Sequence, residues 1–302
     1  MRKTVLVTGA NGLLGNAIFR LTKGQGRLGI IATGRGERRP SVPEAIPYTS
    51  CNLEDEQSVK TMLEDVKPDV IIHGAAMTQV DACEQTPDVC MRANVDATRY
   101  LLKHAPAHTR MVFVSTDFVF DGTKAMYRET DAPNPISVYG ESKLLAEKEV
   151  INSGRSYAIL RTMLVYGYAP ELSRTNIVLW VVDSLKNGKN IRVVDDQFRG
   201  PTLVDNLANA CLLASDSHNN SVYHISSSDY ISMYDFARKI ADVWNLDDTL
   251  ISPIKSSELG QPAARPPKTG FVIDRAMEEL NFRPISIDEG LRQMYKRLTN
   301  NH

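Results

Sequence analysis

The 302-residue chain lacks any hydrophobic run long enough to span a membrane, and Met1-Arg-Lys3 leads into an expected strand rather than a signal-peptide core. These absences predict a cytoplasmic protein without a membrane partner. Charge of one sign is not in excess either, because 35 Lys and Arg residues face 36 Asp and Glu residues. Nothing in this balance favours nucleic acid as a partner. The length suffices for one large domain or two modest ones.

Cysteine and histidine are also scarce. The four cysteines, Cys51, Cys83, Cys90 and Cys211, form no C-x-x-C pair, and the six histidines show no ligand spacing. The sequence therefore predicts reduced thiols and no metal site.

The clearest positive signal is a glycine-rich turn near the N-terminus. The run Val5-Leu-Val7 predicts a strand buried on both faces of a parallel sheet, and a helix through Ile18, Phe19 and Leu21 follows. Three glycines between them are typical of a dinucleotide site, where the backbone approaches a pyrophosphate and a helix N-terminus faces the phosphates. A turn that only connects two elements is the alternative. The predicted cofactor contacts here are Gly9, Asn11, Gly12, Leu13, Leu14 and Gly15.

The second expected strand, 28–33, ends without the acidic residue that an NAD-selective site usually carries there. Arg35 follows instead, with Arg38 or Arg39 in support, and an arginine suits a 2′-phosphate. We therefore predict that NADP(H) binds at least about tenfold tighter than NAD(H). NAD(H) stays open as the cofactor, and a solvated basic loop is the alternative for this segment.

Later segments continue the alternation of strands and helices. Asn52 and Leu53 follow a short strand and are expected at the adenine edge, and the small residues Ala75 and Ala76 follow a buried strand where a cofactor would lie against the backbone. A further strand is expected over 110–116. This pattern predicts an α/β fold with a Rossmann-type, doubly wound parallel sheet.

Three residues carry the expected chemistry. Thr116 ends a strand at the sheet edge where ligands collect, and Tyr139 and Lys143 lie one helical turn apart. An ammonium beside a phenol favours the phenolate, so we expect Lys143 to lower the pKa of Tyr139 and make it an acid–base group. Lys143 is also a candidate for the nicotinamide ribose. A Y-x-x-x-K spacing also occurs by chance in helices, where the tyrosine packs and the lysine is solvated.

Several motifs together resemble the extended short-chain dehydrogenases/reductases, and within them the dTDP-4-dehydrorhamnose reductase family. The matching stretches are Thr8-Gly-Ala-Asn-Gly-Leu-Leu-Gly15, 74–84, Ala93-Asn-Val-Asp96, 115–122, Tyr139-Gly-Glu-Ser-Lys-Leu144, 161–167, Asp196-Gln-Phe-Arg-Gly-Pro-Thr202 and 264–267. The resemblance implies that Thr116, Tyr139 and Lys143 are catalytic, and that Thr78, Val80 and Asp117 border a sugar. It also implies a cofactor domain over 1–165 and a small α/β substrate-binding part over 166–302.

The chain departs from the family at two positions near the expected sugar. Phe118 replaces a tyrosine, and Leu164, which we include among the substrate contacts, replaces a tryptophan. Because a lost hydrogen-bonding group often changes which substrate a site selects, the sugar and its base stay open. A homodimer is also possible from the sequence.

The C-terminal part of the sequence gives weaker signals. Trp180 is expected to pack in a helix, with stacking on a base as a minor alternative. Phe198 and Arg199 are candidates for the nucleotide of a substrate, because a ring stacks and an arginine pairs with diphosphate, although a solvated loop fits equally. Arg265 could reach a phosphate or anchor its own loop. Ser232 is expected to cap an amphipathic helix.

Two functions of different classes follow. The first is an NADPH-dependent reductase of a nucleotide-linked 4-keto-6-deoxy sugar. The second is a binding subunit, because the chain also resembles the regulatory β subunit of methionine adenosyltransferase, which serves a partner enzyme. An epimerase or dehydratase is disfavoured, since a dehydratase would carry an Asp-Glu pair after the catalytic threonine and this chain has Asp117-Phe118.

Overall fold

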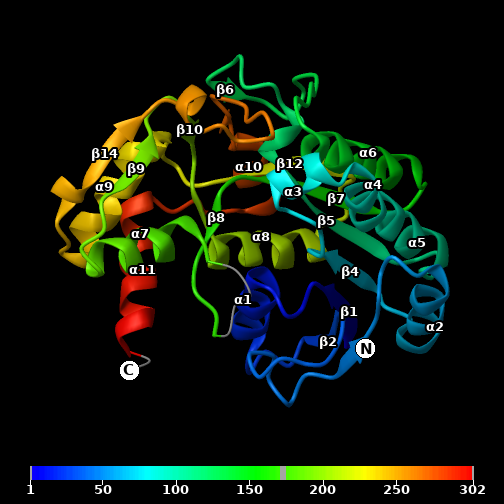
Figure 1. The fold of residues 1–302 in the computed structure, drawn as a ribbon. Helices are drawn as coiled ribbons and strands as arrows, with labels where there is room; N and C mark the ends of the chain where they lie inside the picture. The colour runs from blue at the N-terminus through cyan, green and yellow to red at the C-terminus, as the bar shows by residue number, and fades with distance from the viewer. Residues whose placement is uncertain (1, 171–174, 301–302) are drawn as a thin grey trace.

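A seven-stranded parallel sheet forms the centre of the computed structural model, which describes residues 2–170 and 175–300 (Figure 1). Its strands run in the spatial order β12-β7-β5-β4-β1-β2-β3. The order reverses between β1 and β4, and in such sheets ligands collect at the carboxyl ends of the strands around that point. The strands are β1 (Lys3–Thr8), β2 (Leu28–Gly34), β3 (Tyr48–Ser50), β4 (Val70–His73), β5 (Arg110–Thr116), β7 (Tyr157–Thr162) and β12 (Ser221–Ile225). The predicted Rossmann-type sheet is confirmed.

Helices cover both faces of this sheet (Figure 1). On one face, α1 (Leu13–Thr22) and α8 (Val204–Asp216) pack with the strands around Val5, Val7 and Leu160. On the other, α2 (Glu56–Val66), α5 (Ala97–His104) and α6 (Val138–Asn152) pack around Leu6, Ile71 and Phe113. Alternate residues of one strand thus serve two cores, which explains the uninterrupted apolar run in β1.

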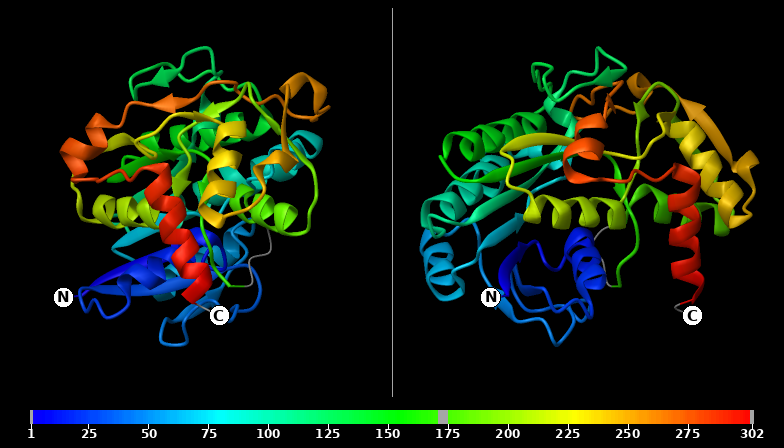
Figure 2. Two further views of the ribbon diagram at one scale, coloured as in Figure 1. Left: turned by 90° about the vertical axis from the view of Figure 1, so that its left-hand side faces the viewer. Right: turned by 180° about the vertical axis from the view of Figure 1, so that it is seen from behind.

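A separate hydrophobic core, away from the two faces of the central sheet, lies in the later part of the chain. It joins α7 (Ile177–Lys186), α9 (Met233–Trp244), α11 (Ile287–Asn300), β9 (Ile191–Val194) and β14 (Ile251–Ile254), and the two strands pair in parallel. Figure 2 shows α11 beside these elements and away from β1 and β2. The same part of the chain also sends β12 and α8 back to the central sheet.

The remaining elements are short. The helices α3 (Val80–Gln85) and α4 (Pro87–Met91) precede a π-helical turn (Arg92–Asp96) that leads into α5, and α10 (Asp274–Leu280) packs near β12. The paired short strands are β6 (Met126–Tyr127) with β15 (Gly270–Phe271), β8 (Val165–Tyr166) with β11 (Thr202–Leu203), and β10 (Phe198–Arg199) with β13 (Ile231–Ser232). Among the described residues, every helix is too short or too polar to cross a bilayer.

Two local expectations for the later part have different outcomes. Ser232 caps α9 as predicted, because its hydroxyl accepts the N–H of Asp235, and Phe236 and Trp244 of that helix are buried. Trp180, in contrast, is 38 % exposed. The buried stripe of α7 runs through Val178, Val181, Val182 and Leu185, which leaves Trp180 on the opposite side. The prediction that Trp180 packs in the core is therefore wrong.

Candidate active site

The glycine turn between β1 and α1 forms a close cradle. Gly9 has φ +71°, and a Cβ built on it would come within 3.0 Å of the backbone nitrogen of Ala75. A Cβ on Gly15 would come within 2.6 Å of the carbonyl oxygen of Ala10. Leu13 and Leu14 form the first turn of α1, where backbone N–H groups have no partner within the helix. The turn therefore combines close backbone approach with a helix N-terminus, as an anion site requires.

Two adjoining cavities open beside this turn, with volumes of about 390 Å³ and about 530 Å³. They share Gly9, Gly34, Arg35, Ala75 and Ala76 in their walls. The first also contains Asn52 and Leu53, and the second contains Asn11, Gly12, Leu13, Arg39 and Thr78. The structure thus brings most of the predicted cofactor contacts to one cleft at the carboxyl ends of β1, β2 and β4.

The basic segment after β2 divides into residues with different tasks. The Arg35 side chain is 79 % exposed and lies 3.5 Å from the Glu54 carboxylate. Arg38 instead donates to the carbonyl oxygens of Glu44 and Ile46, so it fastens its own loop. Of the two, Arg35 is the one that faces the cleft.

Asn11 holds that segment in place, which the sequence did not reveal. Its Oδ1 accepts the backbone N–H of Arg39 at 3.2 Å, and its Nδ2 donates to the Tyr48 hydroxyl at 3.2 Å. Tyr48 donates in turn to the carbonyl oxygens of Gly34 and Gly36. Asn11 therefore couples the glycine turn to the segment that carries Arg35.

Asn94 is a second residue that sequence reasoning passed over. It lies in the π-helical turn, is 1 % exposed, and its side chain bonds both the N–H (2.8 Å) and the C=O of Met77. Its Nδ2 also donates to the Ser142 hydroxyl at 2.9 Å. Asn94 thus ties the strip after β4 to α6, beside Lys143. A π-helical turn is frequent at functional sites, but the sequence showed only helical periodicity here.

Tyr139 lies in the first turn of α6, where Ser137 caps the helix by accepting the N–H of Gly140. Its ring packs edge-on against Phe118 at a centroid distance of 5.5 Å, in a cluster with Cys83 and Cys90. Burial raises the pKa of Tyr139, and hydrogen bonding with Thr116 opposes that rise only in part. The expectation that Lys143 lowers this pKa is therefore wrong, because the desolvation of a buried phenolate outweighs it.

Lys143 lies on the same face of α6 and is 3 % exposed. Its Nζ lies 4.0 Å from the ring centroid of Phe113, a cation–π contact. Burial lowers the pKa of Lys143 to about 7, while the Glu147 carboxylate favours the charged form. Near pH 7 the ammonium and the neutral amine are thus both present.

Two of the four buried cysteines lie in the Tyr139 cluster. The Cys90 thiol contacts the Ser142 hydroxyl at 3.4 Å, and hydrogen bonding with Cys83 lowers the pKa of Cys90 to about 7. Cys51 and Cys211 differ, because burial raises the pKa of each.

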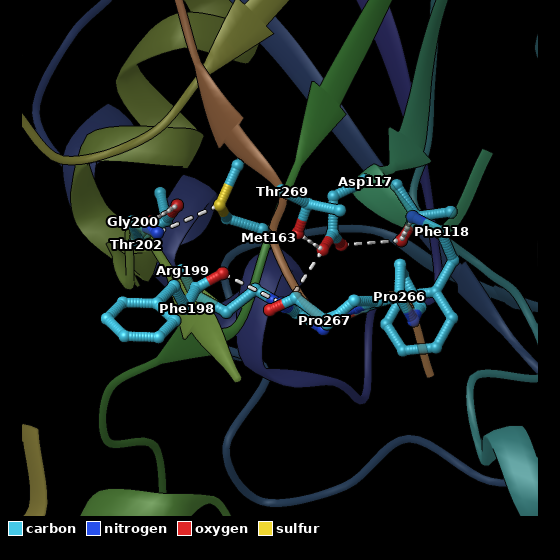
Figure 3. A network of polar contacts seen from close by, with 11 residues as sticks. Asp117, Phe118, Met163, Phe198, Arg199, Gly200, Thr202, Pro266, Pro267 and Thr269 are labelled. Carbon is cyan, nitrogen blue, oxygen red and sulfur yellow. Dashed lines mark hydrogen bonds and ion pairs between the residues drawn. The ribbon is translucent and has the colours of Figure 1, made fainter. Parts of the chain in front are cut away.

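Asp117 and Arg199 do not lie free at a sugar or a diphosphate. Both are buried, and Arg199 Nε lies 3.2 Å from Asp117 Oδ2 (Figure 3). The Arg199 guanidinium also donates to the carbonyl oxygens of Phe198, Pro266 and Pro267. The prediction that Arg199 is available for a diphosphate is therefore wrong in this structure, because protein partners already occupy it.

The other expected substrate contacts surround Tyr139 or line the cleft. Val80 begins α3 and packs in the Tyr139 cluster, and Thr78 lies in the wall of the larger cavity. Leu164 connects β7 and β8 with φ +41°, a backbone conformation that is uncommon for leucine. Of the two alternatives for Arg265, the structure shows loop anchoring, since Arg265 Nη2 lies 2.7 Å from Asp81 Oδ2.

Known proteins share this chain's fold and much of its sequence. The dTDP-4-dehydrorhamnose reductase of Bacillus anthracis, solved in complex with NADP, is 28 % identical and superimposes with a TM-score of 0.84 over 98 % of this chain and 100 % of that one. The dTDP-4-dehydrorhamnose reductase structure from Clostridium acetobutylicum gives a TM-score of 0.85 at 28 % identity, covering 98 % and 99 % of the two chains.

Two sequence relatives carry names of different functional classes. The methionine adenosyltransferase 2 subunit beta of Xenopus laevis is 32 % identical over 85 % of this chain and 77 % of its own length. The protein named "Probable low-salt glycan biosynthesis reductase Agl14", of Haloferax volcanii, is 32 % identical over 94 % of this chain and 95 % of its own length. A family profile described as the RmlD substrate binding domain matches residues 2–300. With nearly its whole length matched, the chain belongs to this RmlD family.

Proposed function

We propose that this protein reduces the 4-keto group of a nucleotide-linked 6-deoxy sugar with NADPH. The observation that carries the proposal is the arrangement of Tyr139 and Lys143 on one face of α6, with Thr116 at the end of β5 in hydrogen-bonding contact with Tyr139. A similar solved structure, a dTDP-4-dehydrorhamnose reductase in complex with NADP, supports it, and so does the sequence relative named as a probable glycan biosynthesis reductase.

The residues present fit a nicotinamide dinucleotide. At Gly9 and Gly15 an added Cβ would meet backbone atoms, so both positions require glycine, and the pyrophosphate is expected at the first turn of α1. Asn52 and Leu53 would border the adenine, and Ala75 and Ala76 leave the strip after β4 open to the cofactor. Arg35 would hold the 2′-phosphate, and Lys143 the nicotinamide ribose.

The chain's own groups account for the proton in the reduction. A bound nicotinamide supplies the hydride to the carbonyl carbon. The Tyr139 phenol, which burial keeps protonated at neutral pH, donates its proton to the carbonyl oxygen, which becomes a hydroxyl. Thr116 lies beside the phenol and orients it. Phe118 and the other apolar neighbours of Tyr139 keep water away from the phenol. Thr78, Val80 and Leu164 would border the sugar.

NADPH consumption with a panel of nucleotide 4-keto-6-deoxy sugars tests this proposal. Turnover with at least one of them supports it. A second candidate, a binding subunit that serves a partner enzyme, is favoured by the identity to the methionine adenosyltransferase subunit beta and by Phe118 and Leu164. Absence of turnover with every sugar, together with co-purification of another enzyme, would favour that candidate. The expected homodimer stays a prediction.

Arg35 is expected to set the preference for the phosphorylated cofactor. The wild-type protein should bind NADPH at least about tenfold tighter than NADH, and Arg35→Ala should bring the two dissociation constants within about threefold, because the charge-assisted contact is lost. Titration calorimetry measures both. Arg27→Ala, which removes an exposed arginine just before β2, at the opposite end of that strand, should leave the ratio unchanged. Equal affinities in the wild type would contradict the assignment.

Lys143 is expected to take up a proton when the cofactor binds at about pH 8. Above a pKa of about 7 the free protein carries the neutral amine, and a ribose hydroxyl that accepts from the ammonium favours the charged form. Calorimetry of NADPH binding in buffers of different ionisation enthalpy should therefore show up to about one proton taken up per chain. Lys143→Met should remove that uptake. Unchanged uptake in this variant would assign the proton to another group.

A further inference from the structure

The Asp117 carboxylate lies between the catalytic threonine and two segments from the later part of the chain. Its Oδ1 accepts the Thr116 hydroxyl at 3.2 Å. Its Oδ2 accepts the Thr269 hydroxyl at 2.6 Å and lies 3.2 Å from Arg199 Nε. Figure 3 shows Asp117 from the end of β5, Arg199 from β10 and Thr269 from the segment before β15 close together. Each carboxylate oxygen thus serves a different part of the molecule.

The Asp117–Arg199 ion pair is almost fully buried. The side chains of Arg199 and Asp117 are 5 % and 2 % exposed. The N–H groups of Arg199 that do not face Asp117 donate to backbone carbonyl oxygens, which fixes the guanidinium in place. A charge buried without its partner is costly, so Asp117 depends on Arg199 to stay ionised.

The charge on Asp117 decides which way the Thr116 hydroxyl points. An ionised carboxylate only accepts hydrogen bonds, so Thr116 must donate its single proton to Asp117. The Thr116 oxygen is then left to accept, and it already accepts the backbone N–H of Phe118 at 3.2 Å. Tyr139 also hydrogen-bonds with Thr116. Protonation of Asp117 would remove this constraint, because a carboxylic acid can itself donate to Thr116.

We propose that Asp117 is a positioning residue whose carboxylate, held ionised by Arg199, holds the Thr116 hydroxyl in one orientation beside the Tyr139 phenol. The inference rests on the proposed function, because it gives Tyr139 the role of proton donor. It adds a specific task for β10 and for Thr269, which would otherwise only pack against the catalytic strand. Asp117 and Arg199 act through Thr116 and need not touch substrate.

Removal of the Arg199 charge should expose the titration of Asp117. Burial raises the pKa of Asp117, and Arg199 is the main charge that opposes this rise, with Thr269 and Thr116 as hydrogen-bonding partners. Tyr139 also faces Asp117, and Tyr230 and Arg265 lie near Arg199. Without Arg199 the pKa of Asp117 rises further, so its carboxylate is protonated, and the Thr116 orientation lost, at a higher pH than in the wild type.

The test is the pH profile of kcat in Arg199→Met. We expect wild-type kcat to stay constant as the pH falls from about 8 to about 6. We expect kcat of Arg199→Met to fall about tenfold or more toward pH 6. The sign separates this effect from Lys143, whose ammonium is lost as the pH rises. Arg199→Lys keeps a positive charge and should restore much of the level profile. Arg265→Met is the matched control, because it frees the same loop from Asp81 without removing a partner of Asp117.

A second variant covers the case in which Arg199→Met does not fold. Asp117→Asn is neutral at every pH, so its kcat should be low without any new acid limb. The side-chain carboxyl resonance of Asp117 is identified in carbon-13 spectra as the one that disappears in Asp117→Asn. Its chemical shift reports the ionisation of Asp117 without turnover, and it should show an ionised carboxylate in the wild type at pH 7. An unaltered profile in folded Arg199→Met, or a protonated Asp117 at pH 7, would overturn the inference. Absence of wild-type turnover would instead count against the proposed function alone.

Discussion

Tyr139→Phe should lower kcat for NADPH-dependent ketone reduction by about 10²- to 10⁴-fold while the affinity for NADPH changes little. The substitution removes only the hydroxyl that donates the proton to the carbonyl oxygen. The ring stays, and with it the edge-on contact with Phe118 and the packing against Cys83 and Cys90. Stopped assays of product formation and fluorescence titration of NADPH measure the two quantities separately.

Tyr223→Phe provides the matched control for that experiment. Tyr223 is also fully buried, and its hydroxyl also has a partner, Glu279, at 2.9 Å, but it lies on β12 at the edge of the sheet. The Tyr223→Phe variant should lose about 1 kcal/mol in the free energy of unfolding and keep its turnover. If Tyr139→Phe kept kcat within about threefold of the wild type, the phenol could not be the main proton donor, whatever the cofactor affinity.

The elements that form the cleft could be predicted from the sequence because their signals are local. The apolar run of β1, the three glycines and the start of α1 lie within fifteen neighbouring positions, and β5 spans Arg110–Thr116 as expected. The Tyr139–Lys143 spacing needs only helical periodicity, which α6 supplies. Chain order and alternation then suffice for the parallel sheet.

Properties that depend on partners distant in the sequence could not be predicted in this way. The pKa of Tyr139 is raised by burial against segments from α3, α4 and the end of β5, so the spacing to Lys143 alone gave the wrong direction. Arg199 appeared available for a phosphate because its partner Asp117 lies at the end of a strand far away in the chain. Asn94 carried no helix-breaking signal, although the π-helical turn gives its side chain four polar contacts.

Glu147→Gln should lose about 3–5 kcal/mol in the free energy of unfolding. Glu147 follows Lys143 by one turn of α6 and is 1 % exposed. Its two oxygens accept Arg161 Nε at 3.0 Å and Arg161 Nη2 at 2.7 Å, and the Ser115 hydroxyl donates to the same carboxylate. Arg161 is itself buried, and its Nη1 has no partner in the described part of the chain. The amide would leave the Arg161 charge uncompensated inside the protein.

Glu149→Gln, two residues further along α6, separates this effect from loss of a surface pair. Glu149 and Arg99 form an exposed ion pair at 2.8 Å, and its loss should cost at most about 1 kcal/mol in a urea titration. The double variant Glu147→Met/Arg161→Met removes both buried charges and should recover most of the stability that Glu147→Gln loses, because packed apolar side chains often replace a buried ion pair without cost. Equal losses in Glu147→Gln and Glu149→Gln would show that burial adds nothing to the Glu147–Arg161 pair.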